Sequence, residues 1–303
     1  MIKSELKANL KIITGPMRLP FLVLAPACVF LGLGSAIWRT GAYNPLYSIL
    51  ALVGAIAAHI SVNALNEYFD FKSGLDMKTT RTPFSGGSGT LPAHPEKYRI
   101  ALQIGVATLM ITALIGIYFI SVWGWGLLPL GLIGLVVVYG YTTWLTRTPL
   151  LCLVAPGLGF GTLMVMGTHF ALTGSYSWAA FFSSLVPFFL VSNLLLLNQF
   201  PDVEADASIG RRHYPIVLRR KGSAVIYVIF LLMTYLAIIA SVIAGVLPSF
   251  TLLGLLTLVI AIPNAVNVYR NADDLAKLIP AMGMNVILNL LTPVLVAIGL
   301  VIG

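Results

Sequence analysis

Polar side chains recur at helical spacing in the segment HISVNALNEYFDFKSGLD. At intervals of four, three and four residues it carries His59, Asn63, Asn66 and Asp70, and Asp76 follows shortly after a glycine. Because an α-helix turns once in about 3.6 residues, the first four side chains are expected on one helical face. The glycine before Asp76 is expected to end the helix.

A second segment, NLLLLNQFPDVEADASIGRR, repeats part of this pattern. Asn198, Asp202 and Asp206 are each four residues apart, which predicts another polar helical face. Pro201 is expected to kink this helix without disturbing the alignment. The two segments together predict two sets of carboxylates that meet at one site.

The oxygen atoms of these side chains suit a hard divalent cation. Two acidic sets facing one cavity need positive charge between them, and neither segment has the His and Cys clusters typical of zinc. Mg²⁺ uses a few carboxylates and completes its octahedron with water and substrate phosphate oxygens, while nearby basic residues contact other phosphate oxygens. The predicted metal ligands are Asn66, Asp70, Asp76, Asp202 and Asp206.

The composition places this site in a membrane protein. Of the 303 residues 58% are hydrophobic and 9% are charged, whereas a soluble domain carries about 25% charged residues. Runs of about 20 apolar residues mark membrane-spanning helices. The sequence therefore predicts an all-α polytopic membrane bundle of nine transmembrane helices, at about 20–38, 47–66, 100–121, 125–145, 150–172, 179–198, 224–246, 250–268 and 280–302.

The charged residues test this number of helices. With nine alternating spans, every basic residue except Arg39 falls on the side of the N-terminus, and so do all 10 acidic residues. The positive-inside rule makes that side cytoplasmic. The basic stretch before residue 20 is expected to lie on the membrane surface rather than to be a cleaved signal. We predict a multi-pass cell-membrane protein whose N-terminus and active-site cavity face the cytoplasm.

The two polar segments also occupy equivalent places in the predicted topology. The pattern Asn-x-x-x-Asp occurs at 66–70 and 198–202, after the second and the sixth span. These spans cross the membrane in the same direction, so the repeat predicts an internal parallel duplication. Its halves would be about 1–145 and 146–303, within a single domain of residues 1–303.

These segments resemble the motifs of the UbiA superfamily of intramembrane aromatic prenyltransferases, and the resemblance covers most of the chain. NEYFDFKSGLD is similar to the Asn-x-x-x-Asp-x-x-x-Gly-x-Asp form of the menaquinone-type (MenA-like) branch. NQFPDVEADASIGRR is similar to the family's second segment, but Gln199, Pro201 and Ala207 replace its usual Asn, Arg and Arg or Lys. Arg211 and Arg212 are the candidates to supply the diphosphate contacts that these changes remove.

The resemblance implies a Mg²⁺-dependent prenyl transfer. A polyprenyl diphosphate would insert its tail among the helices, with one ion on Asn66, Asp70 and Asp76 and another on Asp202 and Asp206. Ionisation would give an allylic carbocation, which an aromatic quinone precursor such as 1,4-dihydroxy-2-naphthoate attacks.

Aromatic and basic residues near the two segments complete the site that the resemblance implies. Tyr68, Tyr139 and Tyr141 are candidates to stabilise the carbocation, and Tyr139 is counted with the five metal ligands as catalytic. The candidate substrate-binding residues are Arg18, Asn63, Tyr68, Lys72, Lys78, Arg81, Tyr141, Asn198, Arg211 and Arg212.

Two other functions remain open from the sequence. The same donor chemistry could use a glycerol-phosphate lipid acceptor, as in archaeal ether-lipid synthesis. A cation transporter with a duplicated acidic site belongs to a different class, although transporter sites usually lie at the bilayer midplane on broken helices. Besides the donor and acceptor, membrane lipids are the expected partners, and no nucleic acid is expected.

Overall fold

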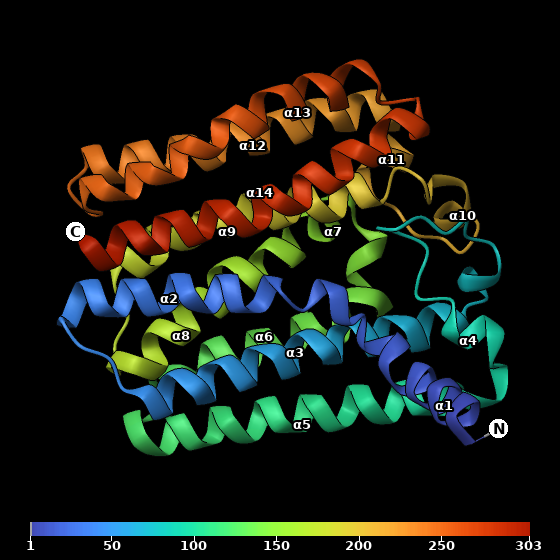
Figure 1. The fold of residues 1–303 in the computed structure, drawn as a ribbon, viewed down its shortest axis with the longest axis horizontal. Coiled ribbons are helices and arrows are strands. Elements are labelled where there is room, and N and C mark those ends of the chain that lie inside the picture. Colours follow the sequence, from blue (N-terminus) through green and yellow to red (C-terminus); the bar gives the residue numbers. More distant parts are fainter. Residues whose placement is uncertain (1) are drawn as a thin grey trace.

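The computed structural model describes residues 2–303, with side chains from residue 10 onward, and every regular element in that range is a helix. Long helices lie side by side in one bundle (Figure 1). They are α2 (Leu24–Thr40), α3 (Pro45–Lys72), α5 (Tyr98–Trp123), α6 (Leu128–Thr143), α7 (Pro149–Gly157) continued by η6 (Leu158–Leu163) and α8 (Met164–Thr173), α9 (Trp178–Asn198), α12 (Arg219–Ile243), η7 (Ser249–Thr257) continued by α13 (Leu258–Arg270), and α14 (Leu275–Ile302).

These helices match the predicted spans in order. Within the described residues, 8 helices are long and apolar enough to cross a membrane unaided. The ninth, α2, qualifies together with the preceding segment Leu10–Phe21, from which it is bent by 47°. That segment comprises the end of α1 (Ile2–Met17) and the short helix η1 (Leu19–Phe21). The predicted all-α membrane bundle is confirmed.

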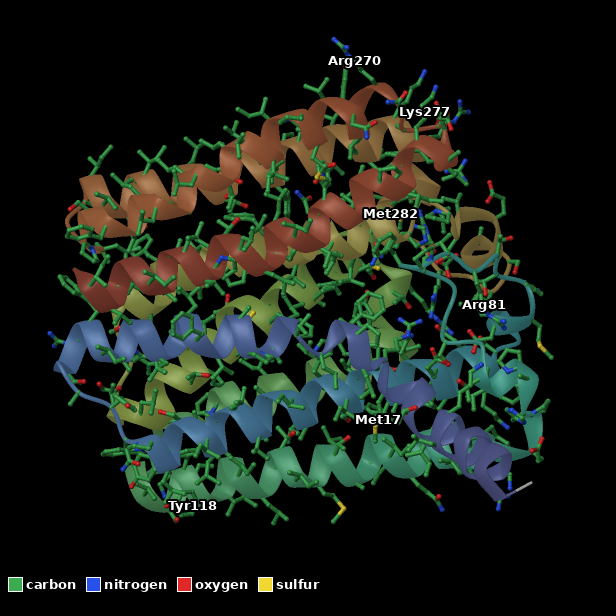
Figure 2. All side chains as sticks on the ribbon, viewed as in Figure 1. Met17, Arg81, Tyr118, Arg270, Lys277 and Met282 are labelled. Atoms are coloured by element: carbon green, nitrogen blue, oxygen red, sulfur yellow. The ribbon has the colours of Figure 1, made fainter. Side chains whose placement is uncertain are left out.

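Polar groups gather at one end of the bundle. α1, α4 (Thr90–Ala93), α10 (Val203–Ala207) and α11 (Tyr214–Val217) lie at this end, and the C-terminal end of α14 lies at the other (Figure 1). Figure 2 shows nitrogen and oxygen atoms concentrated there, around the labelled Arg81 and beside Lys277. An odd number of spans places the two chain ends on opposite faces, as observed.

Helix α2 packs in the middle of the bundle, against α3, α8, α9 and α14. Its small residues allow this close approach: a Cβ atom on Gly32 would lie 2.7 Å from the Val165 carbonyl oxygen, and one on Gly34 would lie 2.9 Å from that of Ala297. Small residues at such crossings are typical of helix packing in membranes. They let α2 pack closely against α8 and α14.

The fifth span changes to π-helical geometry at η6. Glycines also let this span approach α9 closely, because a Cβ atom on Gly157 would lie 2.1 Å from the Phe188 carbonyl oxygen, and one on Gly161 would lie 2.5 Å from the Phe188 nitrogen. A π-turn shifts the side chains that follow it, and such turns are frequent at functional sites. Here Phe160 packs edge-on against His59 of α3, with ring centroids 4.6 Å apart.

Candidate active site at the polar end of the bundle

The first polar segment forms the last turns of α3, as predicted. Asn66 Nδ2 donates hydrogen bonds to Asp70 Oδ2 at 3.0 Å and to Thr142 Oγ1 of α6 at 3.0 Å. The helix ends at Lys72, and Gly74 adopts the left-handed conformation with φ 77°. The polar face along α3 is therefore real, and the glycine ends the helix where the sequence indicated.

Asp76 lies beyond this turn, in η2 (Leu75–Met77), and is buried. Gly87 packs directly against it, so that a Cβ atom there would lie 3.0 Å from Asp76 Oδ1. Asp76 Oδ2 has no hydrogen-bond partner among the described residues. Burial, together with the nearby Glu67 and Asp70 carboxylates, raises the pKa of Asp76 to about 7. The charged form of this carboxylate needs a cation beside it.

The second segment does not continue α9. The helix ends at Asn198, the chain turns, and a separate helix α10 begins at Val203. Pro201 lacks the N–H group that a continuing helix needs, and its ring crowds the carbonyl four residues back. The expectation that Asn198, Asp202 and Asp206 share one face of a kinked helix is therefore wrong. The turn still brings Asp202 and Asp206 to the polar end of the bundle.

Asp202 stands at the start of α10 with an unsatisfied oxygen. Its Oδ1 atom is buried and has no hydrogen-bond partner within residues 10–303. Burial and the neighbouring Asp206 carboxylate raise the pKa of Asp202 to about 7, although the Gly86 N–H opposes this rise. The loop glycines Gly86 and Gly87 therefore lie beside the carboxylates of both segments.

Arg211 joins the two polar segments. Its guanidinium forms ion pairs with Asp70 of the first and Asp206 of the second, and Nη1 lies 2.8 Å from Asp206 Oδ1. Burial by itself would lower the pKa of Arg211, but these carboxylates raise it above its usual value. The second oxygen of Asp206 lies 2.9 Å from Nε2 of the buried His213. The predicted convergence of the two segments is thus observed, with an arginine between them.

Glu67, the neighbour of Asn66 in α3, is buried with 1% of its area exposed. Its Oε1 atom accepts hydrogen bonds from Arg18 Nε at 3.1 Å and from the Ser88 N–H at 2.6 Å. Its Oε2 atom accepts one from the Ser88 hydroxyl at 3.0 Å. Glu67 therefore ties η1, α3 and the loop after η2 together.

A large apolar cavity reaches the two polar segments at Asn66 and Asn198. Its volume is about 560 Å³, and its walls come from many helices of the bundle, among them η1, α2, α3, α5, α6, α7, η6, α8, α9 and α14. The predicted site residues that line it are Arg18, Asn63, Asn66, Tyr141 and Asn198. One continuous space thus connects the two polar segments with the apolar interior of the bundle.

Several predicted residues lie elsewhere. Tyr68 stacks on Tyr98 at 6.0 Å, and Lys72 lies over the same ring at 5.2 Å, on the side toward α5. Tyr139 is 56% exposed, and neither it nor Tyr68 lines the cavity. We therefore leave Tyr68, Lys72 and Tyr139 out of the site proposed below.

The remaining basic candidates, Lys78, Arg81 and Arg212, have different surroundings. Lys78 Nζ lies 3.1 Å from the Ser208 hydroxyl and so connects the two segments at the surface. Arg81 packs its guanidinium against Gly89 of the loop. Arg212 is exposed, and its backbone N–H donates to the Thr146 carbonyl oxygen. Of the arginine pair left open by the sequence, Arg211 is the one inside the site.

The donor set fits a magnesium ion delivered with a phosphate. In the described part of the chain no three His, Cys, Asp or Glu side chains are already gathered around one point. The free oxygens of Asp76 and Asp202 are nevertheless buried beside other carboxylates, and the available donors are oxygens. Mg²⁺ needs only one or two carboxylates when phosphate and water complete its shell.

Comparison with known proteins decides the family. The model of the UbiA prenyltransferase family matches residues 24–287. The chain belongs to the UbiA prenyltransferase family. The predicted family and the predicted transferase class are thereby confirmed, and the cation-transporter alternative has no support.

Two relatives are 1,4-dihydroxy-2-naphthoate octaprenyltransferases. The one from Bacillus subtilis is 28% identical over 203 residues, which span 66% of this chain and 64% of that protein. The one from Haemophilus influenzae is 25% identical over 306 residues, which span 99% of both. The match to the first relative thus covers less than two thirds of its length.

Two solved structures share the fold. A UbiA homologue from Aeropyrum pernix superposes with a TM-score of 0.71 at 17% identity, covering 94% of this chain and 98% of that one. A UbiA homologue from Archaeoglobus fulgidus, bound to DMAPP and Mg²⁺, superposes with a TM-score of 0.62 at 15% identity, covering 96% and 99%. Both confirm the arrangement of helices.

Proposed function

We propose that the protein transfers a polyprenyl group from a polyprenyl diphosphate to an aromatic quinone precursor, with Mg²⁺ as cofactor. One observation carries this proposal: Arg211 joins the two aspartate segments, and a cavity of about 560 Å³ reaches the same segments at Asn66 and Asn198. Such a space suits a ligand with a highly charged head and a long apolar tail. The octaprenyltransferase relatives support 1,4-dihydroxy-2-naphthoate as the acceptor.

The polar end would bind the diphosphate. Asn66, Asp70 and Asp76 would hold one Mg²⁺ and Asp202 and Asp206 another, and the bound ions would neutralise charge on the leaving diphosphate. Arg211 is the cation best placed to contact the same group, since it already lies between the two segments. Lys78 and Arg81 lie on the adjoining loop and would add positive charge.

The apolar cavity would hold the tail and protect the reacting carbon. Heterolysis of the allylic C–O bond leaves the electron pair on the diphosphate and a carbocation on the prenyl group, which water would quench. Phe160 and Tyr141 line the cavity and offer aromatic faces to that cation. An electron-rich ring carbon of the acceptor then forms the new C–C bond. The group already on that carbon, a proton or a carboxylate lost as carbon dioxide, leaves its bonding electrons to the ring and so restores the aromatic system.

The polar end is proposed to face the cytoplasm of a cell membrane. Among the described side chains, Lys72 ends α3 and Arg270 ends α13 at the polar end, whereas Arg39 lies in the last turn of α2 at the other end. An excess of basic residues marks the cytoplasmic side of membrane proteins. Both substrates would then reach the site from the cytoplasmic leaflet.

Product formation in purified protein tests this function. The protein is incubated with labelled geranylgeranyl diphosphate and either 1,4-dihydroxy-2-naphthoate or geranylgeranylglyceryl phosphate, with Mg²⁺ or with EDTA. We expect a prenylated naphthalene product and diphosphate release only with Mg²⁺. Product formed only from the lipid acceptor would support the archaeal-type alternative. The absence of product and of diphosphate release with both acceptors would contradict both functions.

A further inference from the structure

A buried histidine contacts the second aspartate segment. His213 is 1% exposed, and its Nε2 atom lies 2.9 Å from Oδ2 of the buried Asp206. The ionised carboxylate of Asp206, which also pairs with Arg211, accepts hydrogen bonds and cannot donate them. Nε2 is therefore the donor and carries the hydrogen. The other ring nitrogen, Nδ1, has no hydrogen-bond partner among the described residues, so the imidazole is directed by Asp206.

The chain between Asp206 and His213 forms a loop that closes on Asp206. The backbone N–H groups of Ile209 and Arg211 donate to the Asp206 carbonyl oxygen at 3.3 and 3.1 Å. Gly210 lies between them with φ 82°, a conformation that favours glycine. This turn brings the side chains of both Arg211 and His213 back to the carboxylate of the residue at which the loop begins.

The two oxygens of the Asp206 carboxylate have different partners. Oδ1 accepts from Nη1 of Arg211 at 2.8 Å, and Arg211 also pairs with Asp70 of the first segment. Oδ2 accepts from His213. The torsion that turns a carboxylate has broad minima, so a donor on one oxygen decides where the other one points. His213 thus fixes the direction of Asp206 independently of Arg211, and this direction would persist when Arg211 contacts a diphosphate.

We propose that His213 is a positioning residue, which holds Asp206 in the direction in which its carboxylate meets Mg²⁺ and Arg211. This inference rests on the proposed magnesium-diphosphate site and adds to it the residue that orients one of its carboxylates. His213 does not line the apolar cavity, and it acts through Asp206. Loss of such a supporting hydrogen bond typically lowers metal affinity by about 10–100-fold.

Two amide replacements separate positioning from packing. In His213→Gln, the side-chain N–H can reach about as far as Nε2 of histidine. In His213→Asn, the amide is one methylene shorter and does not reach Asp206. Both variants place a neutral amide in the same buried surroundings. His213→Gln is therefore expected to keep the function that His213→Asn loses.

Equilibrium dialysis of labelled pyrophosphate over a series of Mg²⁺ concentrations measures the effect without turnover. In His213→Asn, the Mg²⁺ concentration for half-maximal binding should rise at least about tenfold, because Asp206 loses its fixed direction. In His213→Gln it should stay within about threefold of the wild type, since the hydrogen bond is kept. Wild-type binding by His213→Asn, or an equal rise in His213→Gln, would overturn the proposal.

A double-variant cycle shows whether His213 acts through Asp206. In an Asp206→Asn background, His213→Asn should raise the required Mg²⁺ concentration by less than about twofold, because the carboxylate is already absent. The full tenfold rise in that background would overturn the proposal, since His213 would then act by another route. If Asp206→Asn binds no pyrophosphate, the comparison of His213→Asn with His213→Gln decides the question.

Rates of prenyl transfer give a second readout. The Mg²⁺ concentration for the half-maximal rate should rise at least about tenfold in His213→Asn, while kcat at saturating Mg²⁺ returns to within about threefold of the wild type. A kcat that stays low at saturating Mg²⁺ would contradict positioning of a metal ligand. His169→Asn is the matched control and should change neither value. His169 is also buried and lies 2.9 Å from Ser35, in α8 away from α10 and α11 (Figure 1).

The failure of this inference differs from the failure of the proposed function. A wild type that binds pyrophosphate with Mg²⁺ but forms no prenylated product would contradict the transfer, and the dialysis would still decide the role of His213. A wild type without Mg²⁺-dependent binding would overturn both. Thermal unfolding of each variant in detergent is measured alongside. If His213→Asn does not fold, His213→Ser, which also cannot reach Asp206, takes its place.

Discussion

The two aspartate segments reach the same site by different local structures. In the first, the polar residues lie on the unbroken end of α3, whereas in the second α9 stops at Asn198 and α10 begins after Pro201. Each segment nevertheless gives one carboxylate to Arg211, and another carboxylate of each has a buried oxygen without a hydrogen-bond partner in the described part of the chain. The two segments therefore place their carboxylates in the same two kinds of surroundings, although the backbone that carries the carboxylates is different.

That comparison bears on the proposed duplication. The matching residues at 66–70 and 198–202 predict two equivalent helix ends. In the structure, Asp70 lies inside α3, whereas Asp202 lies beyond the end of α9. The internal duplication itself stays a prediction. Variants that change one segment at a time show how far the two segments are functionally equivalent.

The largest expected effects come from the carboxylates. Asp70→Asn and Asp202→Asn should each lower turnover at least about a thousandfold, because each removes a charge that the bound diphosphate complex needs. Prenyl transfer from labelled donor measures this. Asp273→Asn is the control, since Asp273 is exposed and, among the described side chains, pairs with Lys221 at 3.7 Å. Full activity in either site variant would remove that segment from the mechanism.

A smaller but sharper effect separates two neighbouring arginines. Arg211→Gln should lower turnover at least about a hundredfold, because it leaves Asp70 and Asp206 buried without their shared partner. Arg212→Gln should change turnover by less than about threefold, since that side chain is exposed. Initial rates at saturating substrates compare the two. Equal losses would show that the bridge between the segments has no special role.

The smallest effect concerns how the first segment ends. Gly74→Ala should destabilise the protein by about 1 kcal/mol, because φ is 77° there although nothing crowds the new Cβ atom. Thermal unfolding in detergent should show a loss of about 2 °C. Gly116→Ala, inside α5 and equally uncrowded, should not destabilise. Unchanged unfolding of Gly74→Ala would mean that the turn tolerates a side chain.

Local spacing predicted the parts of the site that depend on one helix. The face of Asn66 and Asp70 follows from the helical repeat, and the hydrogen bond between them confirms it. The same reasoning failed at Asp202, because Pro201 ended the helix instead of kinking it. A proline near a helix end allows both outcomes, and packing decides between them.

Contacts between distant residues lay beyond prediction from the sequence. Glu67 is adjacent to Asn66, but its burial depends on Arg18, 49 residues away, and on Ser88 of a loop. His213 is buried only because the chain after α10 folds back onto Asp206. No spacing rule distinguishes Arg211 from Arg212, since only the tertiary fold shows which one reaches Asp70. For Glu67, the signal available in the sequence was a charged residue directly beside the polar face of a helix.

Binding of Mg²⁺-pyrophosphate tests most directly whether the two segments form one site. Equilibrium dialysis with labelled pyrophosphate is carried out on the wild type, Asp70→Asn, Asp202→Asn and the double variant, with Mg²⁺ or EDTA. We expect Mg²⁺-dependent binding that falls at least about tenfold in each single variant, with little further loss in the double variant. Wild-type affinity in either single variant, or the same binding in EDTA, would contradict a shared magnesium-diphosphate site.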